Sequence, residues 1–251
     1  MTVIAVSGKG GTGKTVVAAL LIKIFTEQNS KSVLAIDADP ASSLPQALGI
    51  KVKGTIGGIR EKMLAGRDQL PPGIVKRDLL EYQVMEILTE TPKFDLLVMG
   101  RSEGPGCYCA INHLLREIID TFAKNYGIVI IDTEAGLEHL SRRTTRDVDM
   151  LLSITDPTMR GLMTAKRIKE LVNELHIKIG QIHLIANRIT EETLEPVKKS
   201  AVELGLKLVG AIPEDENIMQ LDLNGKPIID LSLNSPALKS ITQIAQSLGL
   251  I

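Results

Sequence analysis

Short apolar runs and longer helical patterns alternate along the whole chain. Several of the runs are apolar almost throughout, as expected of parallel strands that are buried on both faces. They predict strands at Thr2–Ser7, Ser32–Ile36, Phe94–Met99, Ile128–Asp132, Met150–Thr155, Gln181–Ala186 and Lys207–Ile212. Patterns of helical period predict helices at Lys14–Gln28, Ala110–Asn125, Thr158–Leu175, Glu191–Leu204 and Pro236–Leu248. This alternation predicts an α/β fold with a doubly wound, mostly parallel sheet of about seven strands.

One stretch, residues 54–90, is less regular and carries Pro71-Pro72-Gly73 in its middle. We interpret it as an insertion of helices and loops between the second and third core strands. No internal repeat, low-complexity tract or linker divides the chain. The 251 residues are enough for one α/β domain with a substantial core, so we expect a single domain over residues 1–251.

Composition narrows the class of protein. Hydrophobic residues make up 44% and charged residues 24%, which is ordinary for a soluble globular protein. The formal net charge of -1 argues against a protein that coats nucleic acid. No apolar run is long enough to cross a bilayer, and the amino-terminal residues read as a strand and not as a signal peptide. We therefore expect a cytoplasmic protein that binds neither nucleic acid nor membrane.

A glycine-rich loop between the first predicted strand and the first predicted helix carries the clearest chemistry. It reads Gly8, Lys9, Gly10, Gly11, Thr12, Gly13, Lys14 and Thr15, a Walker A sequence in its required context. The glycines allow backbone N–H groups to surround phosphates, and the helix amino terminus adds a favourable dipole. We predict that Lys14 contacts the β and γ phosphates of ATP and that the Thr15 hydroxyl binds Mg²⁺.

A dinucleotide-binding fold is a rival on spacing alone. The same loop satisfies the pattern Gly8-x-Gly10-x-x-Gly13, and the acid Asp37 ends the second predicted strand. A dinucleotide site has no need of the cation and hydroxyl supplied by Lys14 and Thr15, so this pair favours a nucleoside triphosphate.

Acidic residues at two other strand ends predict hydrolysis. Asp37 and Asp39 follow the second strand, at the edge where ligands bind in open α/β sheets. One carboxylate can support the metal shell while the other orients a water molecule for attack on the γ-phosphate. Asp132 ends a Walker B strand and would hold Mg²⁺ through water, and Gly136 would let the following loop move with the γ-phosphate. Taken singly, each Asp is more commonly a helix cap or a solvated turn residue.

The extra lysine, Lys9, makes the loop resemble that of the deviant Walker A ATPases, the family of MinD, ParA and the nitrogenase iron protein. Further matches follow in order along the chain: Asp37-x-Asp39-Pro40, Asp132-x-x-x-Gly136, Asn187-Arg188 and Ile212-Pro213-Glu214-Asp215. The resemblance implies an ATP-favoured homodimer in which Lys9 reaches the partner's nucleotide and Asp39 orients the water. It also implies that Asn187-Arg188 and the Pro213-Glu214-Asp215 segment bind adenine.

The only two cysteines stand together in Gly104-Pro105-Gly106-Cys107-Tyr108-Cys109. Two thiols at i and i+2 supply two ligands for a soft metal, whereas a closed S₄ site needs four, which a symmetric dimer would supply. Two ordinary free cysteines in a loop are the alternative. His113 is a weaker candidate ligand, for which a solvated or capping role is the commoner one. The motif resembles that of the CooC-type accessory ATPases, which implies nickel insertion into carbon monoxide dehydrogenase.

The client enzyme, the metal and one rival function stay open, whereas a second rival function is disfavoured. The related maturation ATPases of acetyl-CoA synthase share the pattern, and Ni²⁺ and Zn²⁺ are equally compatible with four thiolates. An iron–sulfur reductase like the nitrogenase iron protein also bridges its dimer with four cysteines, but places them far apart in sequence. A membrane-cycling ATPase would end in a basic amphipathic helix, whereas Pro236–Leu248 contains a single lysine and reads as a core-packing helix.

Overall fold

The computed structural model describes the chain except for residues 29–30, 65–74, 102–108, 136–146 and 175–177. Eight strands of the described residues form one sheet: β1 (Thr2–Gly8), β2 (Val33–Asp37), β3 (Thr89–Glu90), β4 (Asp95–Val98), β5 (Ile128–Asp132), β6 (Asp147–Thr155), β7 (Lys178–Ile189) and β8 (Leu208–Pro213). Their order is β3-β4-β2-β5-β1-β6-β7-β8. All neighbours are parallel except β3 and β4, so the predicted doubly wound sheet is confirmed. The two-residue β3 is the additional strand, and it is too short to produce a periodic pattern.

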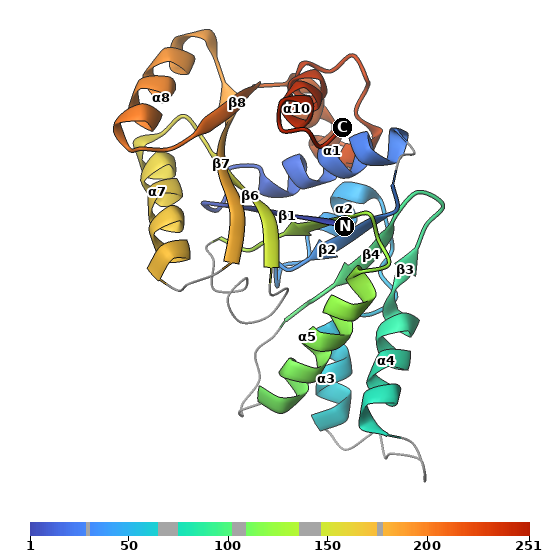
Figure 1. The fold of residues 1–251 in the computed structure, drawn as a ribbon. Coiled ribbons are helices and arrows are strands. Elements are labelled where there is room, and N and C mark those ends of the chain that lie inside the picture. Colours follow the sequence, from blue (N-terminus) through green and yellow to red (C-terminus); the bar gives the residue numbers. More distant parts are fainter. Residues whose placement is uncertain (29–30, 65–74, 102–108, 136–146, 175–177) are drawn as a thin grey trace.

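Helices connect the strands on both faces of the sheet (Figure 1). The described α-helices are α1 (Lys14–Glu27), α2 (Leu44–Leu48), α3 (Ile56–Leu64), α4 (Lys76–Ile87), α5 (Cys109–Ala123), α7 (Met159–Glu174), α8 (Glu191–Glu203), α9 (Glu216–Leu223) and α10 (Pro236–Ser247), with a 3₁₀ helix at Ile228–Asp230. The five predicted helices are present with ends displaced by at most two residues. The described parts of the irregular stretch 54–90 contain α3, α4 and β3.

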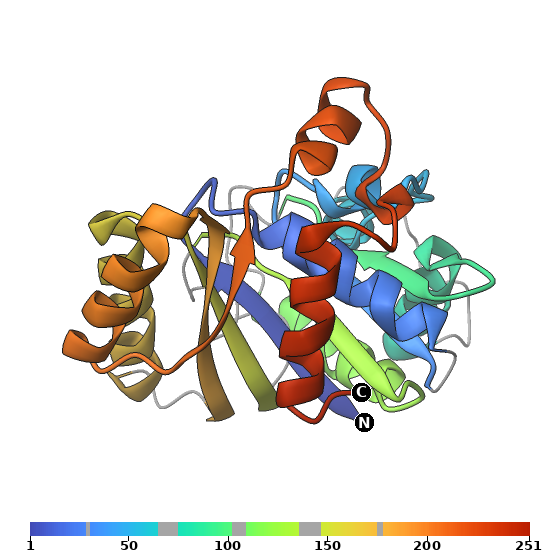
Figure 2. The same cartoon turned by 90° about the horizontal axis from the view of Figure 1, so that it is seen from above.

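The core is aliphatic and divided by the sheet. Ile4 and Val6 of β1 face α1 and α10, whereas Val3 and Ala5 of the same strand pack in the opposite layer with α5 and α7. Figure 2 shows α10 lying beside α1 above the sheet. Burial of each Val, Leu or Ile side chain contributes about 1.5–3 kcal/mol. Successive side chains of β1 point to opposite faces of the sheet, and both faces are buried. The run Thr2–Ser7 is therefore apolar almost throughout.

The last helix packs into the core, as predicted. On α10 the residues Ala237, Leu238, Ile241, Ile244 and Ala245 are buried, and they share a cluster with α1. Within the described parts of the chain, no helix combines the length and the apolar composition that crossing a bilayer requires.

Strand register brings the ends of β1, β2, β5 and β6 together at the carboxyl edge of the sheet. Asp132 of β5 pairs with Val6 of β1 on one side and with Asp37 of β2 on the other. Gly8 pairs with Ile154 of β6. The loop after β1 and the acids at the ends of β2 and β5 therefore converge, although they are separated widely in sequence.

Candidate nucleotide site

The loop Gly8–Thr15 follows β1 and opens α1, as the Walker A prediction requires. Gly8 has φ +149°, and a Cβ there would lie 2.2 Å from the carbonyl oxygen of Ile154, so only glycine fits against β6. Gly11 and Gly13 have φ of +79° and +88°, in the region that favours glycine. No described atom lies within 4 Å of a Cβ built on Gly10 or Gly11, so the space above the loop is open to a ligand.

The interior of the loop is organised around the backbone oxygen of Lys9. The Thr12 hydroxyl donates to that oxygen at 2.9 Å, and the Lys14 ammonium lies 3.4 Å from it. Lys14 is only 8% exposed, so its charge is directed into the loop and not into solvent. Gly13 caps α1 without a side-chain hydrogen bond, which leaves the first N–H groups of the helix available to an anion.

Asp37 is buried and holds the turn that follows β2. Its two carboxylate oxygens accept hydrogen bonds from the N–H groups of Asp39 and Leu44, each at 3.0 Å. Burial raises the pKa of Asp37 to about 6. Asp39 is partly exposed, and its Oδ1 accepts from the N–H of Ala41 at 2.8 Å. The buried carboxylate of Asp37 therefore shapes the turn, whereas Asp39 is partly exposed.

Asp132 is fully buried, and burial raises its pKa to about 7. No described donor reaches either of its oxygens with good hydrogen-bond geometry, although the Thr15 hydroxyl lies close enough to oppose the rise in pKa. That hydroxyl is 3.2 Å from the hydroxyl of Ser43. A buried carboxylate without a partner is costly unless a cation compensates it. Asp132, Asp37 and the Thr15 hydroxyl thus have the chemistry that a bound Mg²⁺ needs.

Asn187 reaches the loop from the end of β7. Its Nδ2 donates to the carbonyl oxygen of Thr12 at 2.8 Å, and a Cβ on Gly13 would lie 2.3 Å from the same nitrogen. The side chain therefore supports the phosphate loop. The neighbouring Arg188 is exposed and has φ +57°, a backbone conformation that is uncommon outside glycine.

The segment after β8 lies next to two helix starts. Pro213 ends the strand, and the N–H of Glu214 donates to the carbonyl oxygen of Ile189 at 3.2 Å. Both oxygens of Asp215 are engaged: Oδ1 accepts from Asn217, and Oδ2 accepts from Ser235 and Ala237. Asp215 thus fixes the starts of α9 and α10. A contact with adenine from this segment stays a prediction.

Sequence reasoning missed three residues around the site. Asp156 follows β6, and its Oδ2 lies 3.4 Å from the Lys9 ammonium. Ser43 contacts Thr15, and Thr133 donates its hydroxyl to the carbonyl oxygen of Val6 at 2.9 Å. Asp156 was detectable, since an acid just beyond a predicted parallel strand lies at the same sheet edge as the phosphate loop. Ser43 and Thr133 occur in ordinary turn sequences that carry no such signal.

Residues 104–108 of the cysteine motif lie outside the described residues. Gly136, His139 and His176 lie outside them as well. Only the backbone of Cys109 is described, and α5 begins there, one residue before the predicted start. His113 is exposed, and its Nδ1 lies 3.8 Å from Oε1 of Glu117, consistent with the expected solvated role. His183 is buried within β7 and contacts Gln181, which fits a structural role.

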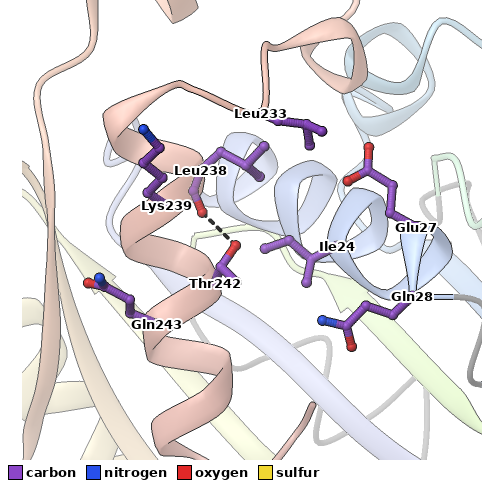
Figure 3. A pocket seen from close by; sticks show the side chains of 8 residues that line it. All are labelled: Ile24, Glu27, Gln28, Leu233, Leu238, Lys239, Thr242 and Gln243. Carbon is purple, nitrogen blue, oxygen red and sulfur yellow. Dashed lines mark hydrogen bonds between the residues drawn. The ribbon is translucent and has the colours of Figure 1, made fainter.

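A separate hollow of about 430 Å³ lies between the far end of α1 and α10 (Figure 3). Ile24 and Leu238 line it with apolar side chains, and Glu27 and Lys239 contribute charge. Ile24 is ten residues beyond Lys14, which corresponds to about 15 Å along a helix. The hollow is therefore distinct from the phosphate loop.

Comparisons with known proteins agree that this chain binds a nucleotide. The CobQ/CobB/MinD/ParA nucleotide binding domain matches residues 3–228. An uncharacterised ATP-binding protein of Methanocaldococcus jannaschii is 51% identical over 98% of each chain. The carbon monoxide dehydrogenase accessory protein CooC of Rhodospirillum rubrum is 30% identical over 91% of this chain and 90% of its own.

Solved structures agree on the fold. MinD in the MinC:MinD complex of Aquifex aeolicus has a TM-score of 0.72 at 23% identity and covers 100% of this chain and 96% of its own. MinD of Pyrococcus horikoshii, solved with Mg-ADP, has a TM-score of 0.68 at 23% identity, over 98% and 95% of the two chains. The chain belongs to the CobQ/CobB/MinD/ParA nucleotide-binding family, and it is an ATPase of the MinD/ParA type.

Proposed function

We propose that this protein is an ATP-dependent metallochaperone that binds a soft divalent metal, nickel in the first place, through Cys107 and Cys109 of two chains. Hydrolysis of ATP would release the ion to a client metalloenzyme, for which carbon monoxide dehydrogenase is our candidate. The observation that carries the proposal is the pairing of a complete phosphate site with a Cys-x-Cys motif placed where the chain enters α5.

The nucleotide half of the proposal rests on the loop and the acids. The N–H groups from Gly10 to Thr15 would surround the phosphates of ATP, and buried Lys14 would neutralise their charge. Mg²⁺, when bound by Thr15 and the two buried carboxylates Asp37 and Asp132, would supply positive charge to the β- and γ-phosphate oxygens. The Mg-ADP bound by the MinD of Pyrococcus horikoshii is in keeping with this choice of ion.

Asp39 is the proposed water-orienting residue. Asp39 is partly exposed, whereas the carboxylate of Asp37 is buried and accepts hydrogen bonds from the N–H groups of the turn. The partly exposed group is the one that a water molecule can reach. Its role would be to hold that water in line with the γ-phosphate, since phosphoryl transfer depends mainly on positioning and charge stabilisation.

The metal half rests on ligand chemistry and on one relative. Thiolates select soft metals, and a four-sulfur site requires two copies of a chain that has two cysteines. Helix α5 begins at Cys109, and the partial positive charge at a helix start favours the thiolate form. The CooC of Rhodospirillum rubrum, 30% identical, is named as an accessory protein of carbon monoxide dehydrogenase, which supports the choice of client.

Metal analysis of the anaerobically purified protein tests this function. We expect Ni²⁺ or Zn²⁺ to be retained by the parent and lost from both Cys107→Ser and Cys109→Ser, while all three proteins bind ATP equally. His113→Gln is the comparison variant: this weaker candidate is exposed and lies 3.8 Å from Glu117, so we expect the variant to retain metal. Retention of metal by both cysteine variants would contradict the proposal. Strong visible absorption with bound iron would favour an iron–sulfur reductase instead.

A further inference from the structure

Helix α9 projects from the carboxyl edge of the sheet. It follows β8, and none of its eight residues is buried. Figure 2 shows it, in orange-red, standing out from the body of the structure. Ile218 and Leu221 pack against the core layer that contains α1 and α10, whereas Met219 and Leu223 are 54% and 74% exposed. Residues four apart share one face of a helix, so the outward face of α9 carries an apolar pair.

Helix α7 carries a second exposed apolar pair at the same edge, with a charge of opposite sign beside it. In its first two turns, Met159 and Met163 are 56% and 47% exposed. Arg160 lies three residues before Met163, as Glu216 lies three residues before Met219, so each charge borders the apolar pair of its own helix. Arg160 and Glu216 are both exposed, and neither forms an ion pair with a described side chain. The two outward faces are therefore complementary in charge.

The two helices flank the phosphate loop on opposite sides. In the sheet, β5 and β2 lie on one side of β1, and β6 lies on the other. Helix α7 follows β6, whereas α9 contacts the 3₁₀ helix Ile228–Asp230, which packs against α2, the helix that follows β2. The loop at the end of β1 thus lies between α9 on the β2 side and α7 on the β6 side. A two-fold axis through the region of this loop would exchange the two sides.

We propose that α9 of one chain docks against the first two turns of α7 of a second copy of this chain. The apolar pair of α9 covers the apolar pair of the facing α7, and Glu216 of one chain pairs with Arg160 of the other. Two-fold symmetry repeats the contact on the other side of the phosphate loop, so each dimer contains it twice. The inference deepens the proposed function and rests on it, since the bridging metal site requires two chains and the docking names the surfaces by which they meet.

Charge reversal tests the docking in solution, with a non-hydrolysable ATP analogue and Mg²⁺ and without nickel. Arg160→Glu brings two acids together at each contact, and Glu216→Arg brings two bases together. Each variant alone should therefore dimerise about tenfold or more weakly than the parent, while still binding the analogue. An equimolar mixture of the two variants should restore dimerisation, because in the mixed dimer both contacts again join opposite charges. Sedimentation of the variants, separately and mixed, measures these effects.

Lys199→Glu is the matched control. It makes the same change of charge at an exposed residue, eight residues into α8 and about 12 Å along that helix from the carboxyl edge, and it should dimerise like the parent. Parental dimerisation of either reversed variant, a mixture as weak as its components, an equal loss in Lys199→Glu, or a parent that stays monomeric with the analogue would overturn the docking. Restored dimerisation in the mixture with no metal bound by the parent would overturn the proposed function alone.

Discussion

The ammonium group of Lys9 lies 3.4 Å from Oδ2 of Asp156 in the same chain. Asp156 is held in place by Thr158, whose N–H and hydroxyl donate to Oδ1 at 3.3 and 2.5 Å. Burial acts to raise the pKa of Asp156, but the hydrogen bonds from Thr158 and Lys9 outweigh it and keep the pKa below its usual value. The carboxylate is therefore ionised and retains Lys9 on its own subunit, away from the facing nucleotide that the family resemblance implies.

Loss of the Asp156 carboxylate should ease dimerisation. The Lys9 and Asp156 side chains are 37% and 21% exposed, and a partly exposed ion pair contributes about 0.2–1 kcal/mol. Asp156→Asn should therefore lower the ATP concentration for half-maximal dimerisation by up to about five-fold.

Lys9→Ala should leave nucleotide binding nearly intact and weaken ATP-dependent dimerisation. Sedimentation with and without ATP measures both effects, and an unchanged equilibrium in both variants would exclude this role of Lys9.

Binding and turnover should separate at Lys14 and Asp39. Lys14→Ala should abolish ATP binding, because the buried ammonium neutralises phosphate charge before any reaction occurs. Asp39→Ala should retain ATP binding and lose turnover by roughly 100-fold or more, because its proposed role begins only with the attacking water. Calorimetry and phosphate release measure the two steps. Parental turnover in Asp39→Ala would remove this residue from the mechanism.

The buried acid Asp132 should make stability depend on pH. Its pKa is about 7 in the folded protein and 3.8 as an unperturbed group, so the stability it contributes is present at low pH and lost as the pH rises through about 7. In protein without Mg²⁺ or nucleotide, Asp132→Asn should melt at least about 2 °C above the parent at pH 8. At pH 5 the difference should be smaller, because only part of the range between the unperturbed pKa of 3.8 and the folded pKa of about 7 has then been crossed. Asp37 has a pKa of about 6, so the stability of Asp132→Asn should still fall as the pH rises, but less than the stability of the parent.

Thermal melts across this pH range supply the measurement, and addition of Mg²⁺ with ATP supplies the control. The parent should gain stability from Mg²⁺ at pH 8, whereas Asp132→Asn should gain less, since it lacks the charge that the ion requires. An equal difference in melting temperature at pH 5 and pH 8 would show that the carboxylate is not a buried, uncompensated charge.

Replacement of Asn187 should weaken the phosphate loop itself. Asn187→Ala leaves the carbonyl oxygen of Thr12 without its 2.8 Å hydrogen bond, at a cost of about 1–3 kcal/mol. We expect the affinities for ATP and inosine triphosphate to fall by the same factor, because the loop contacts phosphate and not base. A loss confined to ATP would instead support the adenine contact that the family resemblance implies.

The alternation of apolar runs was sufficient to predict the parallel sheet, because strands buried on both faces must be apolar throughout. The two-residue β3 and the short α2 carried too few residues for a period to be visible. Loop chemistry was sufficient to predict Lys14, Asp37 and Asp132 as site residues, because glycines and strand-end acids are local signals. The pairing of Lys9 with Asp156 and the position of α7 and α9 on either side of the phosphate loop depend on which strands become neighbours, which no local pattern records.

Titration of Ni²⁺ into nucleotide-free and ATP-bound protein tests the central claim most directly. We predict about half an ion per chain, because four sulfurs require two subunits, and loss of binding in Cys107→Ser and Cys109→Ser. The affinity should differ between the two states, and Ni²⁺ should change the affinity for ATP by the same factor, since linkage is reciprocal. A stoichiometry of one ion per chain that survives both cysteine replacements would contradict the bridging metal site and leave the nucleotide site unaffected.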